Sequence, residues 1–249
     1  MNNQPVIVIP MAGLSSRFTK AGYTLPKYML YAHDKSLFNL AVSSFERYFD
    51  EARFVFIARD VFDTKSFIEK EGELLGIKSF TVVVLDQPTK GQAETVMLGL
   101  EKAGVSDDAS ILIFNIDTFR PGFTFPKEID QWDGYLEVFT GSGANWSYAR
   151  TESEDSTKVV ETAEKREISH YCSTGIYYFR QCADFKEAYG ASGLYTTDRI
   201  KEYYVAPLYN ELIRKGKDIH IHLIPREDVI FCGVPQEYTD YLKQTVKSL

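Results

Sequence analysis

Residues 10–27 combine a flexible loop with two basic side chains, a pattern that could bind a polyphosphate. The loop follows the apolar run at 6–9 and is rich in small residues, so its backbone N–H groups can converge on an anion. Arg17 adds a planar guanidinium that matches phosphate oxygens, and Lys27 adds a point charge directly after the rigid Pro26. The stretch therefore predicts a polyphosphate site.

This loop differs from two common phosphate-binding motifs. It lacks the Gly-Lys-Ser/Thr that ends a P-loop, and it lacks the second and third glycines of a dinucleotide-binding loop. On the loop chemistry alone, an ordinary junction between a strand and a helix is an equal alternative.

A second loop, residues 86–92, places amide side chains beside a glycine. An amide such as that of Gln87 can hydrogen-bond the edge of a nucleobase, while Gly91 lets the backbone approach the base closely. The alternative is a routine turn between a strand and a helix. Lys90 could reach a phosphate or be a solvated surface lysine.

Asp117 follows a strand predicted at 110–114. A carboxylate at a strand end suits Mg²⁺, which prefers oxygen ligands and binds through one or two carboxylates plus phosphates. The alternative is an aspartate that forms a turn or caps a helix. Ligands bind beyond the carboxyl ends of parallel strands, so we expect the loops at 10–18, 86–92 and 115–118 on one edge of a sheet.

These motifs resemble those of the sugar-phosphate nucleotidyltransferases, enzymes that join a nucleoside triphosphate to a phosphorylated metabolite and release pyrophosphate. The resemblance rests on AGLSSRF at 12–18 followed by LPK at 25–27, and on the second loop and Asp117. It is strong over residues 6–30 and weaker over the rest of the chain. Ser15 stands where the family usually has a second glycine, whose absence restricts φ.

The resemblance implies a role for each of these residues. Lys27 is expected near the α-phosphate and Arg17 near the departing pyrophosphate, so both are predicted to be catalytic. Asp117 is expected to hold the catalytic Mg²⁺. The residues expected to bind the nucleotide are Ala12, Gly13, Leu14, Ser15, Ser16, Gln87, Gly91 and Gln92.

Later matches indicate where the acceptor binds. Glu164 and Lys165 resemble a Glu-Lys pair in which the Glu contacts the acceptor's polar groups and the Lys its phosphate; an exposed ion pair is the alternative. Gly175 resembles part of a turn that brings a bare backbone to the acceptor. Phe231 stands where a second metal-binding Asp is expected, so either one carboxylate suffices for Mg²⁺ or Asp228 substitutes.

The spacing of apolar residues predicts the elements that position these loops. Strands are expected at 6–9, 53–58, 79–85 and 110–114, alternating with helices at 36–50, 62–75 and 92–103. This alternation predicts an α/β fold with a doubly wound, mainly parallel, Rossmann-like sheet flanked by helices.

Residues 121–249 are predicted to form a β-rich, acceptor-binding half. Strands are expected at 135–140, 146–150, 158–162, 175–180 and 220–224, and helices near 200–215 and 235–246. Tyr203, Tyr204 and Tyr209 could line a ligand site, but packing is the commoner role. Because no linker separates the halves, we expect a single domain over 1–249, with the nucleotide-binding half at 1–120.

The composition excludes several classes of protein. A net charge of −7 over 249 residues argues against a broad nucleic-acid-binding face. No apolar run is long enough for a transmembrane helix, and the N-terminus lacks a signal-peptide pattern. Three widely spaced cysteines favour a reducing cytoplasm and argue against a zinc site. We expect a cytoplasmic protein with no nucleic-acid or membrane partner; the sequence leaves open whether it is a homo-oligomer.

Within the family, the motif sequences most resemble those of capsule-associated members. Some of these are cytidylyltransferases, including one that acts on phosphoglutamine. The resemblance thus favours CTP and a sugar phosphate or phosphoglutamine-like acceptor. A glycosyltransferase of related fold is one alternative, although residues 115–117 supply only half of its Asp-x-Asp motif. A non-catalytic nucleotide-binding module is another, which Ser15 and Phe231 would favour.

Overall fold

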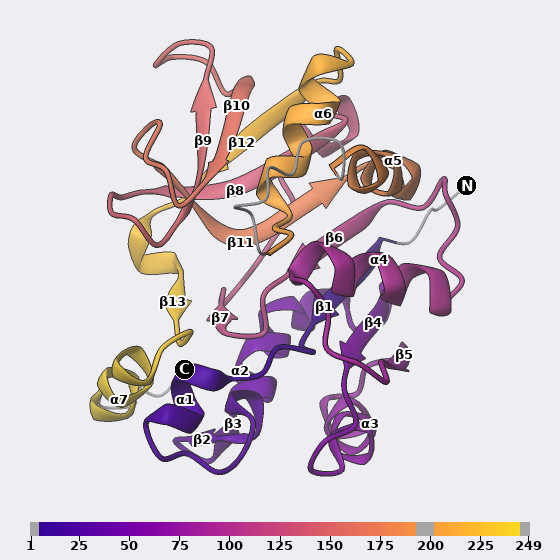
Figure 1. Cartoon of the computed structure of the whole chain (residues 1–249), viewed down its shortest axis with the longest axis vertical. Helices are drawn as coiled ribbons and strands as arrows, with labels where there is room; N and C mark the ends of the chain where they lie inside the picture. Colours follow the sequence, from indigo (N-terminus) through magenta and orange to yellow (C-terminus); the bar gives the residue numbers. More distant parts are fainter. Residues whose placement is uncertain (1–4, 193–201, 245–249) are drawn as a thin grey trace.

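Within residues 5–192 and 202–244, which the computed structural model describes, nine strands form one mixed sheet (Figure 1). Its first part is parallel and begins at β1 (Val6–Pro10). This strand pairs with β6 (Ile111–Phe114) on one side and β4 (Arg53–Ala58) on the other, and β5 (Ser79–Val84) continues the sheet beyond β4.

Helices cover both faces of this parallel part because its strands are apolar on both faces. Val6 and Val8 belong to a core cluster that includes residues of α4 (Gln92–Lys102). Ile7 and Ile9 belong to a second cluster that includes residues of α2 (Leu37–Val42) and α3 (Thr64–Leu75). Since alternate side chains of a strand point to opposite faces, the predicted doubly wound arrangement is confirmed.

The strand β11 (Tyr171–Phe179) joins the second half to the first by pairing antiparallel with β6. It also pairs antiparallel with β8 (Gly134–Thr140) and β9 (Ser147–Thr151). Beyond these, β10 (Val159–Glu164) pairs with β9, and β12 (Ile219–Leu223) runs parallel to β8. The sheet is therefore continuous across residue 120, and the predicted fold class is confirmed.

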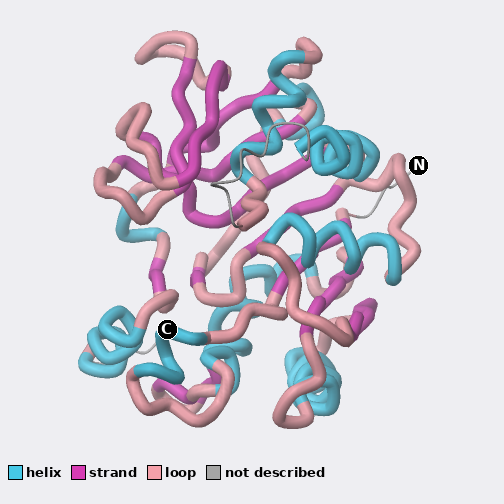
Figure 2. Tube along the Cα trace, in the orientation of Figure 1, coloured by secondary structure: helices cyan, strands magenta, loops and turns pink. Residues whose placement is uncertain are grey.

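Further helices, strands and 3₁₀ turns make up the rest of the fold; Figure 2 colours helices cyan and strands magenta. The remaining helices and strands are α1 (Ser16–Lys20), β2 (Tyr31–Ala32), β3 (Lys35–Ser36), β7 (Thr118–Phe119), α5 (Cys182–Ser192), α6 (Tyr209–Arg214), β13 (Ile230–Phe231) and α7 (Pro235–Lys243). The 3₁₀ turns are η1 (Lys27–Met29), η2 (Ser43–Tyr48), η3 (Ile129–Gln131), η4 (Ala206–Leu208) and η5 (Arg226–Asp228).

Helices account for the main differences from the sequence-based ranges. The helix expected at 36–50 changes from α2 to η2, where Phe45 leaves helical geometry at φ −107° and ψ 19°. The sequence-based ranges include no helix at α5, whose buried side carries Asp184 with its carboxylate 3.0 Å from Lys217 Nζ. The helix expected near 200–215 begins only at η4; its residues 200–201, like 245–246 of the last helix, lie outside the described residues.

Candidate active site

A cavity of about 840 Å³ is lined by the segments that follow β1, β5 and β6. All three loops expected on one edge of the sheet contribute to it. The second half adds residues within 142–147, 164–165, 173–177 and 231–237. Its volume is typical of a site for a cofactor-sized molecule. The cavity lies between the two predicted binding halves.

Most of the predicted site residues meet in this cavity. Its lining includes Ala12, Gly13, Leu14, Ser15, Ser16, Arg17, Lys27, Gly91, Gln92, Asp117, Glu164, Lys165 and Gly175. Gln87 instead lies exposed outside the lining, because the loop presents residues 88–92 to the cavity. The contact of Gln87 with a nucleobase and the ligand roles of the other residues stay predictions.

Lys27 and Asp117 form an ion pair across 90 residues of sequence, with Lys27 Nζ 2.5 Å from Asp117 Oδ2. Lys27 begins η1 directly after Pro26, and its backbone N–H donates to Ser15 Oγ at 3.4 Å. The backbone carbonyl of Asp117 accepts from Cys232 N at 2.8 Å. The two side chains are only 20% and 25% exposed, so the pair faces the cavity from fixed backbone positions.

Ser15 adopts the backbone that glycine would favour. Its φ of 50° and ψ of 29° lie in the left-handed region, immediately before α1 begins at Ser16. A side chain in this region costs about 1–2 kcal/mol, and such strain concentrates at functional sites. Ser15 thus takes the backbone conformation that the usual glycine would take. Arg17 still lines the cavity from the first turn of α1.

The loop before α4 is paired with a segment of the second half. Tyr203 N donates to Lys90 O at 2.8 Å, and Ala93 N donates to Tyr203 O at 2.9 Å. Between them Gly91 has φ 138°, and a Cβ there would lie 2.5 Å from Tyr203 O. The close backbone packing alone therefore requires glycine at position 91.

Glu164 and Lys165 face the cavity from the end of β10. Glu164 accepts a hydrogen bond from Ser147 on β9, and burial raises the pKa of Glu164 although Ser147 and Lys165 oppose this. Lys165 has φ 55°, and its Nζ lies 2.5 Å from Tyr204 Oη and 4.0 Å from Glu164 Oε1. Like Ser15, it is a non-glycine residue in a strained conformation at the cavity wall.

Gly175 packs against Asn115, which lies between β6 and Asp117. Gly175 has φ 93°, and a Cβ there would lie 2.5 Å from Asn115 Nδ2. Asn115 Oδ1 in turn accepts a hydrogen bond from Gln92 Nε2. The contact thus joins the loop expected to face the nucleotide to the turn expected to face the acceptor.

Gly175→Ala is expected to destabilise the fold by about 1–3 kcal/mol, because strain in φ adds to the collision with Asn115. Thermal unfolding measures this change. Gly122→Ala is the matched control, since Gly122 has φ 69° but open space around its Cα. Equal losses for the two variants would contradict the close contact with Asn115.

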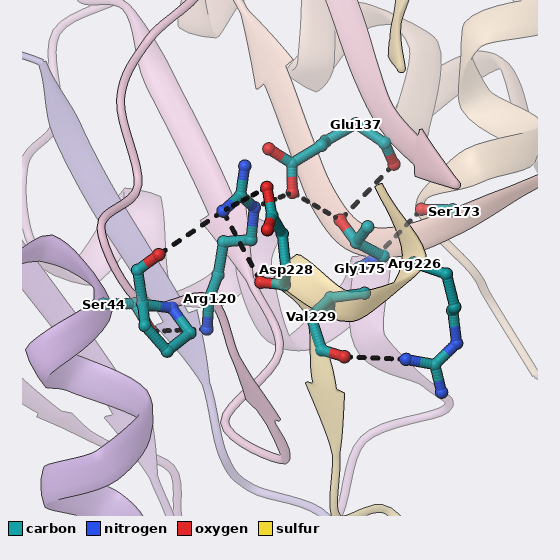
Figure 3. A network of polar contacts seen from close by, with 10 residues as sticks. Ser44, Arg120, Glu137, Ser173, Gly175, Arg226, Asp228 and Val229 are labelled. Atoms are coloured by element: carbon teal, nitrogen blue, oxygen red, sulfur yellow. Dashed lines mark hydrogen bonds and ion pairs between the residues drawn. The ribbon is translucent and has the colours of Figure 1, made fainter. Parts of the chain in front are cut away.

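A buried ion pair between Arg120 and Glu137 lies beside the turn at Gly175 (Figure 3). Arg120 Nε lies 3.0 Å from Glu137 Oε1, and the Thr174 hydroxyl lies 3.1 Å from the same oxygen. Glu137 is fully buried, and burial raises its pKa although Arg120 opposes this. The register of β11 against β8 shifts just after Ser173, so the pair holds an irregular stretch of strand at the cavity.

Glu137→Ala is expected to destabilise the protein by about 3 kcal/mol, because Arg120 would lose its buried partner and keep only the more distant Asp228 carboxylate at 3.9 Å. Chemical denaturation followed by circular dichroism measures the free energy of unfolding. Glu161→Ala is the control: its ion pairs with Arg150 and Arg166 are largely exposed, and we expect a loss below about 1 kcal/mol. Similar losses for both variants would show that burial of the pair does not matter.

Asp117 is the carboxylate best placed to hold a metal ion. Glu237 also lines the cavity, but its Oε2 accepts hydrogen bonds from Gly233 N at 2.8 Å and Val234 N at 3.2 Å at the start of α7. Asp228 lies outside the lining, 46% exposed, with its carboxylate 3.9 Å from Arg120. The geometry thus supports a single carboxylate rather than a substitute for the Asp missing at Phe231.

No group of three or more His, Cys, Asp or Glu side chains is placed to hold a metal within 5–192 and 202–244. Mg²⁺ commonly binds proteins through one or two carboxylates together with substrate phosphates. Asp117, beside a predicted triphosphate loop, fits that donor set.

The folded chain also brings to the cavity residues that the sequence did not single out. These are chiefly Asn115, Trp146, Ser147 and Glu202; Tyr204, which the sequence offered as a possible wall of a ligand site, also lines the cavity. Asn115 had a signal, since it precedes Asp117 at the same strand end. The others come from distant elements, and pattern alone gives no reason to place them together.

No protein-family model matches the chain, and no curated protein matches it. A solved structure, the nucleoside-diphosphate-sugar pyrophosphorylase from Vibrio cholerae RC9, is 56% identical, with a TM-score of 0.92 over 96% of this chain and 100% of that one.

Two more distant structures show the same fold. The inositol-1-phosphate CTP transferase from T. maritima is 15% identical, with a TM-score of 0.71 over 97% of this chain and 94% of that one. The UDP-glucose pyrophosphorylase from Acinetobacter baumannii is 14% identical, with a TM-score of 0.67 over 97% and 92%. In the part of the chain that is described, no helix is both long and apolar enough to cross a membrane. The identity to the Vibrio structure over nearly the whole chain shows that this protein belongs to the nucleoside-diphosphate-sugar pyrophosphorylase family of nucleotidyltransferases.

Proposed function

We propose that the protein transfers a nucleoside monophosphate from a nucleoside triphosphate to a phosphorylated small molecule and releases pyrophosphate. One observation carries the proposal: a single cavity joins the loop at 12–17 and the Lys27–Asp117 pair to Glu164 and Lys165. The name of the 56% identical Vibrio relative supports the same class of reaction.

The proposed reaction is an in-line displacement at the α-phosphorus. An oxygen of the acceptor's phosphate forms a bond to this phosphorus, and the bond to the bridging oxygen breaks, so pyrophosphate leaves with the electron pair. The attacking group is already an anion, so the protein needs no nucleophile of its own. Catalysis is therefore positioning and stabilisation of charge.

Lys27 can exchange Asp117 for an oxygen of the α-phosphate, because both lie at the cavity wall. Arg17 faces the departing pyrophosphate, and Lys165 attracts the acceptor's phosphate. Asp117 would hold Mg²⁺, which supplies neutralising charge to the phosphates. Glu164, partly buried beside Ser147, is suited to bind a hydroxyl of the acceptor.

For the substrates themselves, we favour CTP with a sugar phosphate or a phosphoglutamine-like acceptor, in capsule or surface-polysaccharide biosynthesis. This choice rests on the resemblance of the motifs to capsule-associated cytidylyltransferases. The Vibrio relative's name specifies no nucleobase, so the choice of CTP rests on the motif resemblance alone.

The test is release of pyrophosphate with Mg²⁺, using CTP, UTP, dTTP, GTP and ATP in turn against a panel of phosphorylated sugars and phosphoglutamine. Transfer with CTP as the best donor is expected. A different preferred nucleotide overturns the choice of CTP alone. Nucleotide binding without pyrophosphate release under any combination favours the non-catalytic module, and release of a nucleoside diphosphate from a nucleotide sugar favours the glycosyltransferase.

A further inference from the structure

Residues 202–204 contact both binding regions of the cavity. On one side, the backbone of Tyr203 pairs with Lys90 and Ala93, at either end of Gly91. On the other side, the Tyr204 hydroxyl reaches Lys165 Nζ at 2.5 Å. Glu202 and Tyr204 line the cavity, whereas Tyr203 lies outside the lining.

A chain of hydrogen bonds fixes the direction of the Lys165 side chain. Its ammonium donates to Tyr204 Oη, and the Tyr204 hydroxyl donates in turn to the carboxylate of Glu202. The ammonium also lies 4.6 Å from the centre of the Tyr204 ring. Tyr204 thus holds a 47% exposed lysine that would otherwise be free to move.

The competing partner of this ammonium is Glu164. Its Oε1 lies 4.0 Å from Lys165 Nζ, close enough to attract the lysine but without a hydrogen bond. A lysine released from Tyr204 would move toward this carboxylate. That pairing would engage both acceptor-binding side chains with each other and leave neither for the ligand.

We propose that Tyr204 is a positioning residue that keeps Lys165 apart from Glu164 and directed at the phosphate of the acceptor. The proposal rests on the transferase function proposed above. Because residues 202–204 also pair with the loop before α4, the position of Lys165 depends on the same segment that borders the nucleotide.

Tyr204→Phe and Tyr203→Phe form a matched pair for the test. Each removes one hydroxyl and keeps the ring, and the two positions are adjacent, but Tyr204 alone contacts Lys165 through its hydroxyl. Acetylation by acetic anhydride, followed at Lys165 by mass spectrometry, reports the freedom of its amine without any substrate. Tyr204→Phe is expected to change the rate at Lys165 severalfold and leave other lysines unchanged, whereas Tyr203→Phe leaves Lys165 as in the wild type.

Steady-state kinetics test the role in the reaction with the best acceptor of the panel described above. Tyr204→Phe is expected to raise the acceptor KM about 10-fold, as loss of one hydrogen bond to a charged group predicts, with the KM for the nucleotide unchanged. A purely structural role would instead alter both KM values together or lower the melting temperature. Tyr203→Phe should leave both KM values unchanged.

The two experiments separate the possible failures. An unaltered Lys165 acetylation rate, or an unchanged acceptor KM, in Tyr204→Phe overturns the positioning role. If Tyr204→Phe alters the Lys165 acetylation rate but the wild-type protein transfers to no acceptor, the proposed function is overturned instead, while the contact between Tyr204 and Lys165 stands.

Discussion

Lys27→Ala is expected to lower kcat for pyrophosphate release by about 10²- to 10³-fold, the usual loss on removing one fixed group that stabilises transition-state charge. In the proposed reaction, negative charge builds on the oxygens around the α-phosphorus. The Lys27 ammonium is held at the cavity wall by a short η1 turn and by Asp117, so it needs little reorganisation to meet that charge. Single-turnover kinetics measure the chemical step directly.

The same variant should remain folded. The Lys27–Asp117 pair is partly exposed, so its loss is expected to cost less than about 1 kcal/mol of unfolding free energy. Lys20→Ala is the control, because Lys20 is an exposed lysine of the nearby helix α1 that does not line the cavity. Near-normal single-turnover rates in Lys27→Ala would refute the role of this lysine; a loss shared with Lys20→Ala would point to the general charge of the protein.

The parallel half of the fold could be predicted because its signals are local. The apolar run at 6–9 is β1, and the helix expected at 62–75 is α3, which ends at Leu75 before Gly76 with φ 80°. In contrast, the burial of Asp184 on α5 goes with an ion pair to Lys217, a partner that local patterns do not indicate.

The candidate site divides in the same way. The loop at 12–17, Lys27 and Asp117 could be named because each belongs to a short motif. The contact between Lys27 and Asp117 joins residues 90 positions apart, and the pairing of β1 with β6 brings their segments together. Tyr204 belongs to no motif, and its importance follows solely from the distance between its hydroxyl and Lys165.

Asp117→Asn is expected to abolish measurable Mn²⁺ binding in the presence of nucleotide and to lower kcat by about 10²- to 10³-fold. An amide is neutral, so it is a much weaker ligand for a hard divalent cation than a carboxylate. Glu237, the carboxylate near Asp117 across Gly233, already accepts hydrogen bonds at one oxygen from the backbone of Gly233 and Val234. Electron paramagnetic resonance of Mn²⁺ measures binding independently of turnover.

Asp228→Asn decides between the two explanations for Phe231. Asp228 is exposed beside Arg120 and outside the cavity lining, so its amide variant should bind Mn²⁺ as the wild type does. If Asp228→Asn lost the ion instead, the segment around η5 would have to move toward Asp117 when nucleotide binds. If Asp117→Asn kept it, the nucleotide's own phosphates would suffice, and Asp117 would act only by holding Lys27 before the triphosphate arrives.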